Sequence, residues 1–339
     1  MPEAPFKPIT HPAAWTASEL TKRNDWEIHW DESERDELNA ALRAGADLPL
    51  EELDNDHFPL PTLARQLSAI QDSLENGSGA TIIRGLEIDN LSEAQCRRLF
   101  WGISRHLGTP VSQSAKGEKM FSVRDEGFAE GDARARGPNT RKKLSFHTDR
   151  CDVIGFFCLQ QAKSGGENEV VSSMAIYNRI LETRPDLLEE LFSPYRYLRH
   201  NVDLGNEKPY CEQPIFSFQD GVFASAFLRV LIERAYQRED LPAMTDRQRE
   251  ALDLIEAIAA DETLHLRFHQ QPGDLLFLNN WVTYHRRTEF EDDPDPEKRR
   301  HILRIWLSPP NNRPLAPWFE ANYGATAAGT VRGGMRAAV

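Results

Sequence analysis

The alternation of apolar and polar residues changes along the chain from helical to strand periodicity. In residues 33–45 and 60–77, apolar positions recur every three or four residues, which predicts two helices in a polar, acidic region. Residues 80–88 read as a strand, and residues 91–108 as an amphipathic helix that ends at Gly108. We therefore expect residues 1–75 to form a helical elaboration packed on a main domain.

The remainder of the chain consists mostly of short, strand-like apolar segments. Asp220-Gly221 between two such segments predicts a hairpin, and Thr245 or Asp246 is a suitable N-cap for a helix over 244–262. The other strand-like segments are 153–162, 264–271, 274–287 and 299–310. Many strands interleaved with few helices predict an α+β fold with a mainly β core, a double-stranded β-helix (jelly roll) with flanking helices. The expected units are this domain over 76–315 and a tail over 316–339.

Two segments are expected to lie outside this framework. Residues 123–142 are rich in glycine and charge, which predicts a long loop, and long loops inside compact domains are often functional lids. The last fifteen residues are mostly small, so we expect them either to be disordered or to dock on a partner subunit. A homo-oligomer is therefore one expected arrangement.

Composition narrows the class of partner. A formal charge of −13 argues against a general nucleic-acid or anionic-membrane surface. No apolar run approaches the roughly 18 to 20 residues that span a bilayer, so we expect a soluble, cytoplasmic protein with a small-molecule partner. Cys96, Cys151, Cys158 and Cys211 form no CxxC pair, which predicts buried thiols rather than a zinc finger.

The strongest candidate for chemistry is the segment SFHTDRC, residues 145–151. On an extended strand, His147 and Asp149 project from the same side because side chains two apart share a face. Two histidines and one carboxylate with three open positions suit non-haem Fe(II). His285, at the end of the strand-like segment NNWVTYH, is the candidate third ligand.

Two arginines strengthen this reading. Arg300 and Arg304 follow His285 and share one face of the next strand with Ile302. Buried arginines need anions, and a guanidinium matches a carboxylate in bidentate geometry. A keto acid with a second carboxylate could therefore bind iron at one end and arginine at the other.

With these motifs in order, the chain resembles the taurine dioxygenase-like (TauD/TfdA) family of Fe(II)/2-oxoglutarate-dependent oxygenases. The resemblance rests on HTD, GGEN before a strand, GDLLFLNNWVTYH and the two arginines, and covers roughly residues 80–310. It implies His147, Asp149 and His285 as iron ligands, and Fe(II), 2-oxoglutarate and O₂ as cofactor and co-substrates. It also implies Arg304 as partner of the distal carboxylate of 2-oxoglutarate, with Arg300 near the keto-acid end.

One departure from the family pattern concerns the co-substrate pocket. Family members commonly carry a threonine on the strand after the glycine pair, and the matching position here is taken as Val171. Either Ser172 supplies the hydroxyl contact, or Arg304 works with less help. Arg287 is a further residue of interest, from the related butyrobetaine hydroxylase pattern.

The expected reaction is hydroxylation, or oxidative cleavage after it, of a small polar substrate, with formation of succinate and CO₂. Lys143, Arg150 and Asn280 are the candidate substrate-binding residues; if the two cations face the pocket rather than solvent, the substrate is anionic. Weaker candidates are Trp281, Tyr210 and Arg229.

Two other readings stay open at this stage. His265 and His269 lie on one face of an alternating segment and could form the site of a zinc hydrolase or a metal-sensing cupin. The chain could also be a non-catalytic jelly-roll binding protein, although a binder would have little reason to keep a complete triad and Arg304.

Overall fold

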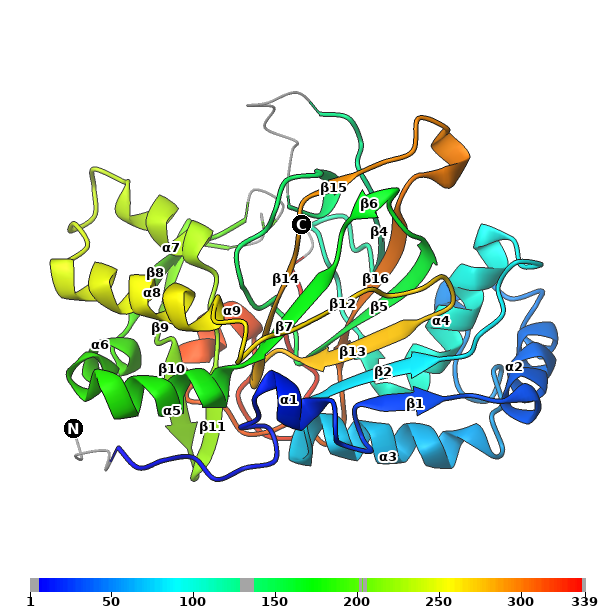
Figure 1. Ribbon diagram of the computed structural model, residues 1–339, viewed down its shortest axis with the longest axis horizontal. Coiled ribbons are helices and arrows are strands. Elements are labelled where there is room, and N and C mark those ends of the chain that lie inside the picture. Colours follow the sequence, from blue (N-terminus) through cyan, green and yellow to red (C-terminus); the bar gives the residue numbers. More distant parts are fainter. Residues whose placement is uncertain (1–5, 129–136, 201–202, 204–205, 337–339) are drawn as a thin grey trace.

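The computed structural model describes residues 6–128, 137–200, 203 and 206–336, and shows β-sheets flanked by helices (Figure 1). Residues 129–136 of the predicted loop lie outside the described residues. The α+β class with a β-sheet core is as predicted.

The helices gather in two groups on either side of the strands (Figure 1). The helices are α1 (Ala17–Leu20), α2 (Glu32–Ala44), α3 (Leu63–Asn76), α4 (Glu93–Leu107), α5 (Ser173–Thr183), α6 (Leu188–Phe192), α7 (Arg229–Tyr236), α8 (Asp246–Ala259) and α9 (Glu320–Tyr323). Short 3₁₀ turns are η1 (Leu50–Glu52), η2 (Gly137–Asn139), η3 (Pro185–Leu187), η4 (Pro296–Lys298) and η5 (Pro317–Phe319).

The main sheet has seven strands in the order β1-β2-β13-β5-β16-β3, with β4 also paired to β16. Its members are β1 (Glu27–His29), β2 (Ala80–Arg84), β3 (Thr109–Pro110), β4 (Met120–Val123), β5 (Val153–Gln160), β13 (Leu275–Asn279) and β16 (His301–Ser308). Every residue of β13 is buried, which explains its almost unbroken apolar sequence between β2 and β5.

A three-stranded sheet, β12-β7-β14, carries one wall of the site. It consists of β7 (Asn168–Ser172), β12 (Leu266–Phe268) and β14 (Thr283–Arg287). The remaining strands pair in twos: β6 (Ser164–Gly165) with β15 (Phe290–Glu291), β8 (Tyr195–Leu198) with β9 (Tyr210–Gln213), and β10 (Phe216–Gln219) with β11 (Val222–Ser225).

Several local predictions are confirmed. The expected N-terminal helices are α2 and α3, and the N-cap of α8 is Thr245, whose hydroxyl accepts the backbone N–H of Gln248. Asp220 and Gly221 join β10 to β11 with φ of 53° and 80°, as a two-residue hairpin turn of this sequence requires.

The N-terminal region also contributes to the main sheet. Its strand β1 pairs in parallel with β2, and Trp15 donates its indole N–H to the carbonyl of Ser78 over 2.8 Å. Helices α2, α3 and α4 share one apolar cluster with the main sheet. The N-terminal region is therefore continuous with the main sheet in both pairing and packing.

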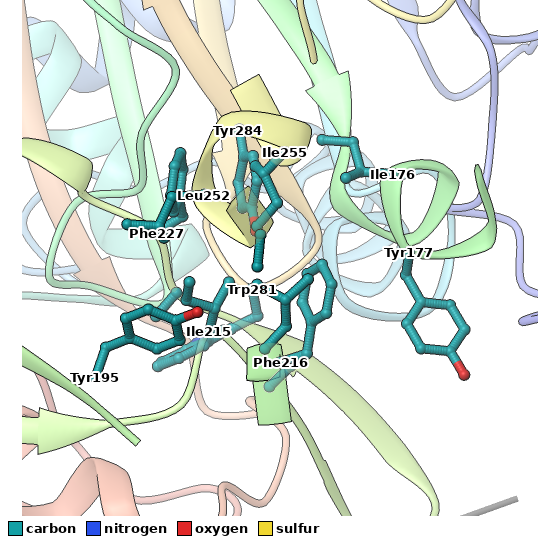
Figure 2. Packing of buried hydrophobic residues seen from close by; sticks show 14 of the residues in the cluster. Ile176, Tyr177, Tyr195, Ile215, Phe216, Phe227, Leu252, Ile255, Trp281 and Tyr284 are labelled. Atoms are coloured by element: carbon teal, nitrogen blue, oxygen red, sulfur yellow. The ribbon is translucent and has the colours of Figure 1, made fainter. Parts of the chain in front are cut away.

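A second apolar core lies behind β14, between helices α5 and α8 and the β10–β11 hairpin (Figure 2). Tyr284 is fully buried there and stacks on Phe227 with ring centroids 5.4 Å apart. Because neighbouring strand residues face opposite ways, the next residue, His285, points to the other side of β14. Packing of Tyr284 thus fixes the direction of His285.

The structure contradicts the disorder that was one of two expectations for the C-terminal tail, in the part of the tail that it describes. Residues 329–335 pack on the chain's own domain: Arg332 and Met335 are 3% and 9% exposed. Gly333 and Gly334 hold left-handed backbone conformations against the segment that follows Asp149. Small residues here allow close approach between backbones rather than disorder.

Candidate active site

A cavity of about 830 Å³ opens between β14, β16, α7 and the segment 140–150. His147, Asp149 and His285 line it together with Arg300 and Arg304. The residues expected to bind metal and co-substrate therefore converge on one space, although they come from positions far apart in the chain.

The three candidate metal ligands are brought to chelating distance by a short antiparallel bridge. The backbone groups of His147 and His285 exchange two hydrogen bonds, of 3.1 and 3.0 Å, and their rings lie 4.5 Å apart. One ligand atom from each of His147, Asp149 and His285 lies within 4.8 Å of the other two. Of the residues in the described part of the chain, these three alone form such a group.

The expected extended strand around HTD is reduced to this bridge. Thr148 is 5% exposed, and its hydroxyl bonds the backbone of Phe227. The backbone N–H of Asp149 is held by the Asn280 side chain over 3.0 Å. Two side-chain contacts therefore fix the backbone that strand pairing would otherwise fix.

The protonation states suit a metal. Burial and the neighbouring His285 lower the pKa of His147 to about 4, so its ring is neutral at pH 7. Its Nδ1 lies 2.9 Å from the carbonyl of Ser145, which only accepts, so the proton is on Nδ1 and Nε2 carries the lone pair. Burial alone would raise the pKa of Asp149, but Arg304 and the two histidines outweigh it and hold that carboxyl ionised.

The residues present fit Fe(II). Asp149 Oδ2 and His285 Nδ1 are buried and have no hydrogen-bond partner among the residues that the structure describes, and Oδ2 lies 3.7 Å from His285 Nε2. A buried carboxylate oxygen without a donor is costly, and a cation would relieve that cost. Two imidazoles and one carboxylate are the donor set of the facial triad.

Arg304 lies at the metal end of the cavity. Its Nη1 is 3.5 Å from Asp149 Oδ2, and its Nε donates to Gln113 Oε1 over 2.7 Å. The guanidinium also lies over the Trp306 ring, 5.2 Å from its centroid. Sequence reasoning did not find Gln113, which lies between β3 and β4 and carried no motif.

Arg300 lies at the other end of this strand face. It is 3% exposed, and its Nε and Nη1 have no hydrogen-bond partner in the described structure. Burial lowers its pKa to about 10, against the opposing effect of Asp292. A buried guanidinium with two unused donors facing a cavity is a binding site for an anion.

The contact expected from Ser172 is contradicted by the structure. The Ser172 hydroxyl donates to the carbonyl of Ala13 and caps α5 by accepting the N–H of Ala175, so it is engaged outside the cavity. Val171 is fully buried in the core behind β14. The residue of this strand that lines the cavity is Asn168, opposite Arg287 in the β7–β14 pairing.

Sequence reasoning missed Asn168, although it ends the GGEN motif. The signal was a polar residue directly after the glycine turn, where β7 begins. Its amide donates one proton to Gln270 Oε1 over 3.1 Å, which leaves the second proton of the same group unassigned.

The structure places the three predicted substrate-binding residues in different surroundings. Lys143 is exposed and lines the cavity. Arg150 also lines it, but its guanidinium is bound by Asp203 (2.5 Å), Asn322 (3.0 Å) and the carbonyl of Gly334 (2.7 Å). Asn280 is 2% exposed and holds the backbone of Asp149, so its predicted substrate contact is wrong.

The other candidates have structural partners. Trp281 is buried and donates to Asp152 over 2.7 Å, and Arg229 lines the cavity but pairs with Glu233, Asp253 and Glu256. Tyr210 lies in β9.

Arg287 donates to the carbonyls of Thr140 and Lys142, and thereby holds the loop that leads to His147. Its pKa is lowered to about 9 by burial and by Arg300.

The rival histidine site is not formed. His265 is 4% exposed and lies near the carbonyl of Ala259, with its other nitrogen 3.7 Å from Glu169. His269 is half-exposed beside Glu167. Arg267, between them, pairs with Glu169, so these side chains make an ion-pair cluster rather than a metal site.

The fold and this donor set define an iron oxygenase of the two-histidine, one-carboxylate kind, and comparison with known proteins agrees. Residues 45–306 match the model of the taurine catabolism dioxygenase TauD, TfdA family. The chain belongs to this family. It is a non-haem Fe(II) dioxygenase that uses 2-oxoglutarate and O₂.

Two relatives match over most of their length. The chain is 30% identical to FR-33289 synthase of Streptomyces rubellomurinus, over 98% of this chain and 97% of that protein. It is 32% identical to the taurine hydroxylase-like protein SAT17 of Stachybotrys chartarum, over 88% and 81% of the two chains.

Solved structures share the fold. An asparagine oxygenase in complex with Fe(II), (2S,3S)-3-hydroxyasparagine and succinate superposes with a TM-score of 0.65 at 18% identity, over 83% of this chain and 93% of that one. The non-haem iron oxygenase OrfP in complex with Fe, succinate and (3S)-hydroxy-L-arginine gives 0.62 at 16% identity, over 83% and 94%.

The alternative of a non-catalytic binder is set aside by the family. No helix among the described residues is both long enough and apolar enough to cross a membrane.

Proposed function

We propose that this enzyme hydroxylates a C–H bond of a small, polar, anionic substrate while 2-oxoglutarate and O₂ become succinate and CO₂. One oxygen atom enters the product and the other enters succinate, so substrate, 2-oxoglutarate and O₂ give hydroxylated substrate, succinate and CO₂. The observation that carries this proposal is the convergence of His147, Asp149 and His285 on a cavity that also holds an unpaired buried arginine.

The three ligands would hold Fe(II), which supplies activation of O₂ when bound. The chain's own contribution is orientation. Ser145 fixes the tautomer of His147, Asn280 fixes the backbone of Asp149, and the packing of Tyr284 fixes the direction of His285. We also infer that the two main sheets form the double-stranded β-helix of this family.

We assign Arg300 to the distal carboxylate of 2-oxoglutarate, which reverses the order expected from sequence. Arg304 lies within ion-pair distance of a metal ligand, so it faces the end of the co-substrate that chelates iron. Arg300 precedes β16 and is separated from Arg304 by a β-bulge between His301 and Ile302, so it is displaced along the chain from the metal ligands. Its unused Nε and Nη1 and the free amide proton of Asn168 are donors for a carboxylate.

The charge of the cavity supports an anionic substrate. Among the described residues that line it, Asp149 alone carries a carboxylate, whereas the cationic lining residues are Lys142, Lys143, Arg150, Arg199, Arg229, Arg234, Arg286, Arg287, Arg300 and Arg304. Several of these are paired, but Lys143 is an exposed cation at the mouth. In a chain of net charge −13, such a wall attracts and orients anions.

The test is succinate formation from 2-oxoglutarate by the apo-enzyme supplied with Fe(II) and ascorbate. We expect His147→Ala, Asp149→Ala and His285→Ala each to abolish succinate formation. The variant His269→Ala should retain it, because His269 is half-exposed and does not line the cavity. Loss of succinate formation in His269→Ala with retention in His147→Ala would contradict the proposal.

A further inference from the structure

The segment Gly329–Met335, here called the C-terminal strap, lies against the turn that follows the metal ligand Asp149. The backbone N–H of Gly334 donates to the carbonyl of Arg150 over 2.7 Å, and the Arg150 Nε–H donates back to the carbonyl of Gly334 over 2.7 Å. Two hydrogen bonds thus join one strap residue to the residue next to the ligand.

The strap is held to the same turn one step further on. Arg332 Nε donates to Asp152 over 2.8 Å, and both side chains are almost fully buried. Asp152 also accepts hydrogen bonds from Trp281 and Ser308. Buried carboxylates with several donors are rigid anchors, so Asp152 fixes the far end of the turn.

The strap sequence is suited to this close contact. Gly333 and Gly334 have φ of 83° and 73°, which other residues rarely adopt. A Cβ at Gly333 would lie 2.8 Å from the carbonyl oxygen of Arg150, and one at Gly334 would lie 2.8 Å from that of Ser112. Only a pair of glycines allows the strap to approach Arg150 and Ser112 in this way.

The strap also reaches the cavity itself. Met335 is anchored by its backbone N–H to the carbonyl of Ser112 over 2.8 Å, and its side chain is part of the cavity lining. Arg150, which bonds the strap through Gly334, also donates hydrogen bonds to the side chains of Asp203 and Asn322. The strap therefore connects the cavity wall to the turn that carries Asp149.

We infer that the C-terminal strap is a positioning element of the active site: through Gly334 and Arg150 it holds the Asp149 carboxylate in place for the metal. This inference rests on the proposed metal site. The Asn280 side chain holds the backbone N–H of Asp149, and the strap holds the next residue, Arg150. These contacts restrict the backbone at Asp149 and therefore the position of its carboxylate. Arg150 is thus a positioning residue rather than a substrate contact.

The test is calorimetric titration of the apo-enzyme with Mn(II), an air-stable substitute for Fe(II), so the readout does not depend on turnover. Gly334→Val places a side chain against Ser112, and Arg150→Lys keeps a cation for Asp203 but removes the Nε donor to Gly334. We expect each to weaken Mn(II) binding about tenfold, the lower end of the effect of removing an outer-shell partner. Val331→Ala, at a strap residue that is 61% exposed, is the matched control and should bind Mn(II) like the wild type.

Thermal unfolding of each variant separates positioning from a general loss of stability. A lowered Tm with Mn(II) affinity within twofold of the wild type, in both Gly334→Val and Arg150→Lys, would overturn the inference. If Gly334→Val does not fold, Arg150→Lys alone decides. Retention of wild-type Mn(II) affinity in His147→Ala would instead contradict the proposed metal site, so the two failures are distinguishable.

Discussion

Replacement of Arg300 by methionine should change stability and co-substrate binding in opposite directions. In the protein without co-substrate, the Arg300 guanidinium is buried with two donors unused, and burial lowers its pKa to about 10 from an ordinary value near 12.5. Because the charged form is disfavoured in the folded state, this cost is present at all pH values below about 10. At about 1.36 kcal/mol per pKa unit it is on the order of 3 kcal/mol. Arg300→Met removes that cost and keeps most of the side-chain volume.

The effect on 2-oxoglutarate follows from the same donors. Two hydrogen bonds to a carboxylate at about 1.5 kcal/mol or more each give about 3 kcal/mol or more. With about 1.4 kcal/mol for each factor of ten, the Kd should rise at least roughly a hundredfold. Arg300 is already desolvated before the co-substrate arrives, so binding does not have to remove water from it again.

The assay is calorimetric titration of 2-oxoglutarate into the Mn(II)-loaded enzyme, with Tm measured on the same samples. Arg299→Met is the matched control because Arg299 is the adjacent arginine and is exposed. We expect Arg300→Met to have a Tm equal to or above that of the wild type and a much weakened Kd, and Arg299→Met to change neither. A Kd for Arg300→Met within threefold of the wild type would refute the assignment, as would a large loss of stability.

Three further outcomes are expected. Asn168→Ala removes one donor to the same carboxylate and should raise the Kd of 2-oxoglutarate about tenfold, at about 1.5 kcal/mol for one hydrogen bond to a charged group. Titration of 2-oxoglutarate into this variant, with His269→Ala as the control, checks the prediction, and an unchanged Kd would exclude the contact. Burial would raise the pKa of Glu169, but hydrogen bonds from Arg286 and Arg267 outweigh it and hold the pKa below its ordinary value. Its stabilisation is therefore fully present above the unfolded pKa of 4.5 and is lost as the pH falls through the lower folded pKa. The Tm difference between wild type and Glu169→Gln should be constant near neutral pH and narrow as the pH falls below 4.5, and a difference that stays constant on this acidification would contradict the reasoning. Burial raises the pKa of all four thiols: Cys96 and Cys211 to about 11, Cys158 to about 12, and Cys151 well above its ordinary value. The native protein should therefore resist alkylation at pH 8, whereas four thiols react after denaturation. A rapidly reacting thiol in the native state would count against their burial.

The sequence by itself predicted several of the helices and strands and the candidate metal ligands that the structure brings together. Periodicity located α2, α3 and α4, and the Asp220-Gly221 pair located a hairpin, because these signals depend on residues close together in the chain. Alternation predicted that His147 and Asp149 face one way. The local pattern was sufficient there, since the bridge to His285 keeps the backbone of His147 extended.

Only the tertiary structure decided which polar side chains are free to bind a ligand. Arg150 and Asn280 are adjacent to the motif or within it, yet both are occupied by partners from distant segments, Gly334 in one case and Asp149 in the other. Ser172 looked available, but it caps α5. A hydrogen-bonding group serves a ligand only when the fold leaves it without a partner, and those partners come from residues remote in sequence.

The same reason underlies the order that we propose for the two arginines and the role that we propose for the tail. Spacing placed Arg300 and Arg304 on one face, but the position of Asp149 relative to that face, which depends on strand pairing, shows which arginine lies at the metal end. The composition of the last residues predicted disorder or a contact with a partner subunit. In the fold, Gly333 and Gly334 make a close contact with Arg150 and Ser112, where a Cβ would collide with a backbone carbonyl. The sequence alone does not show which segment lies against these glycines.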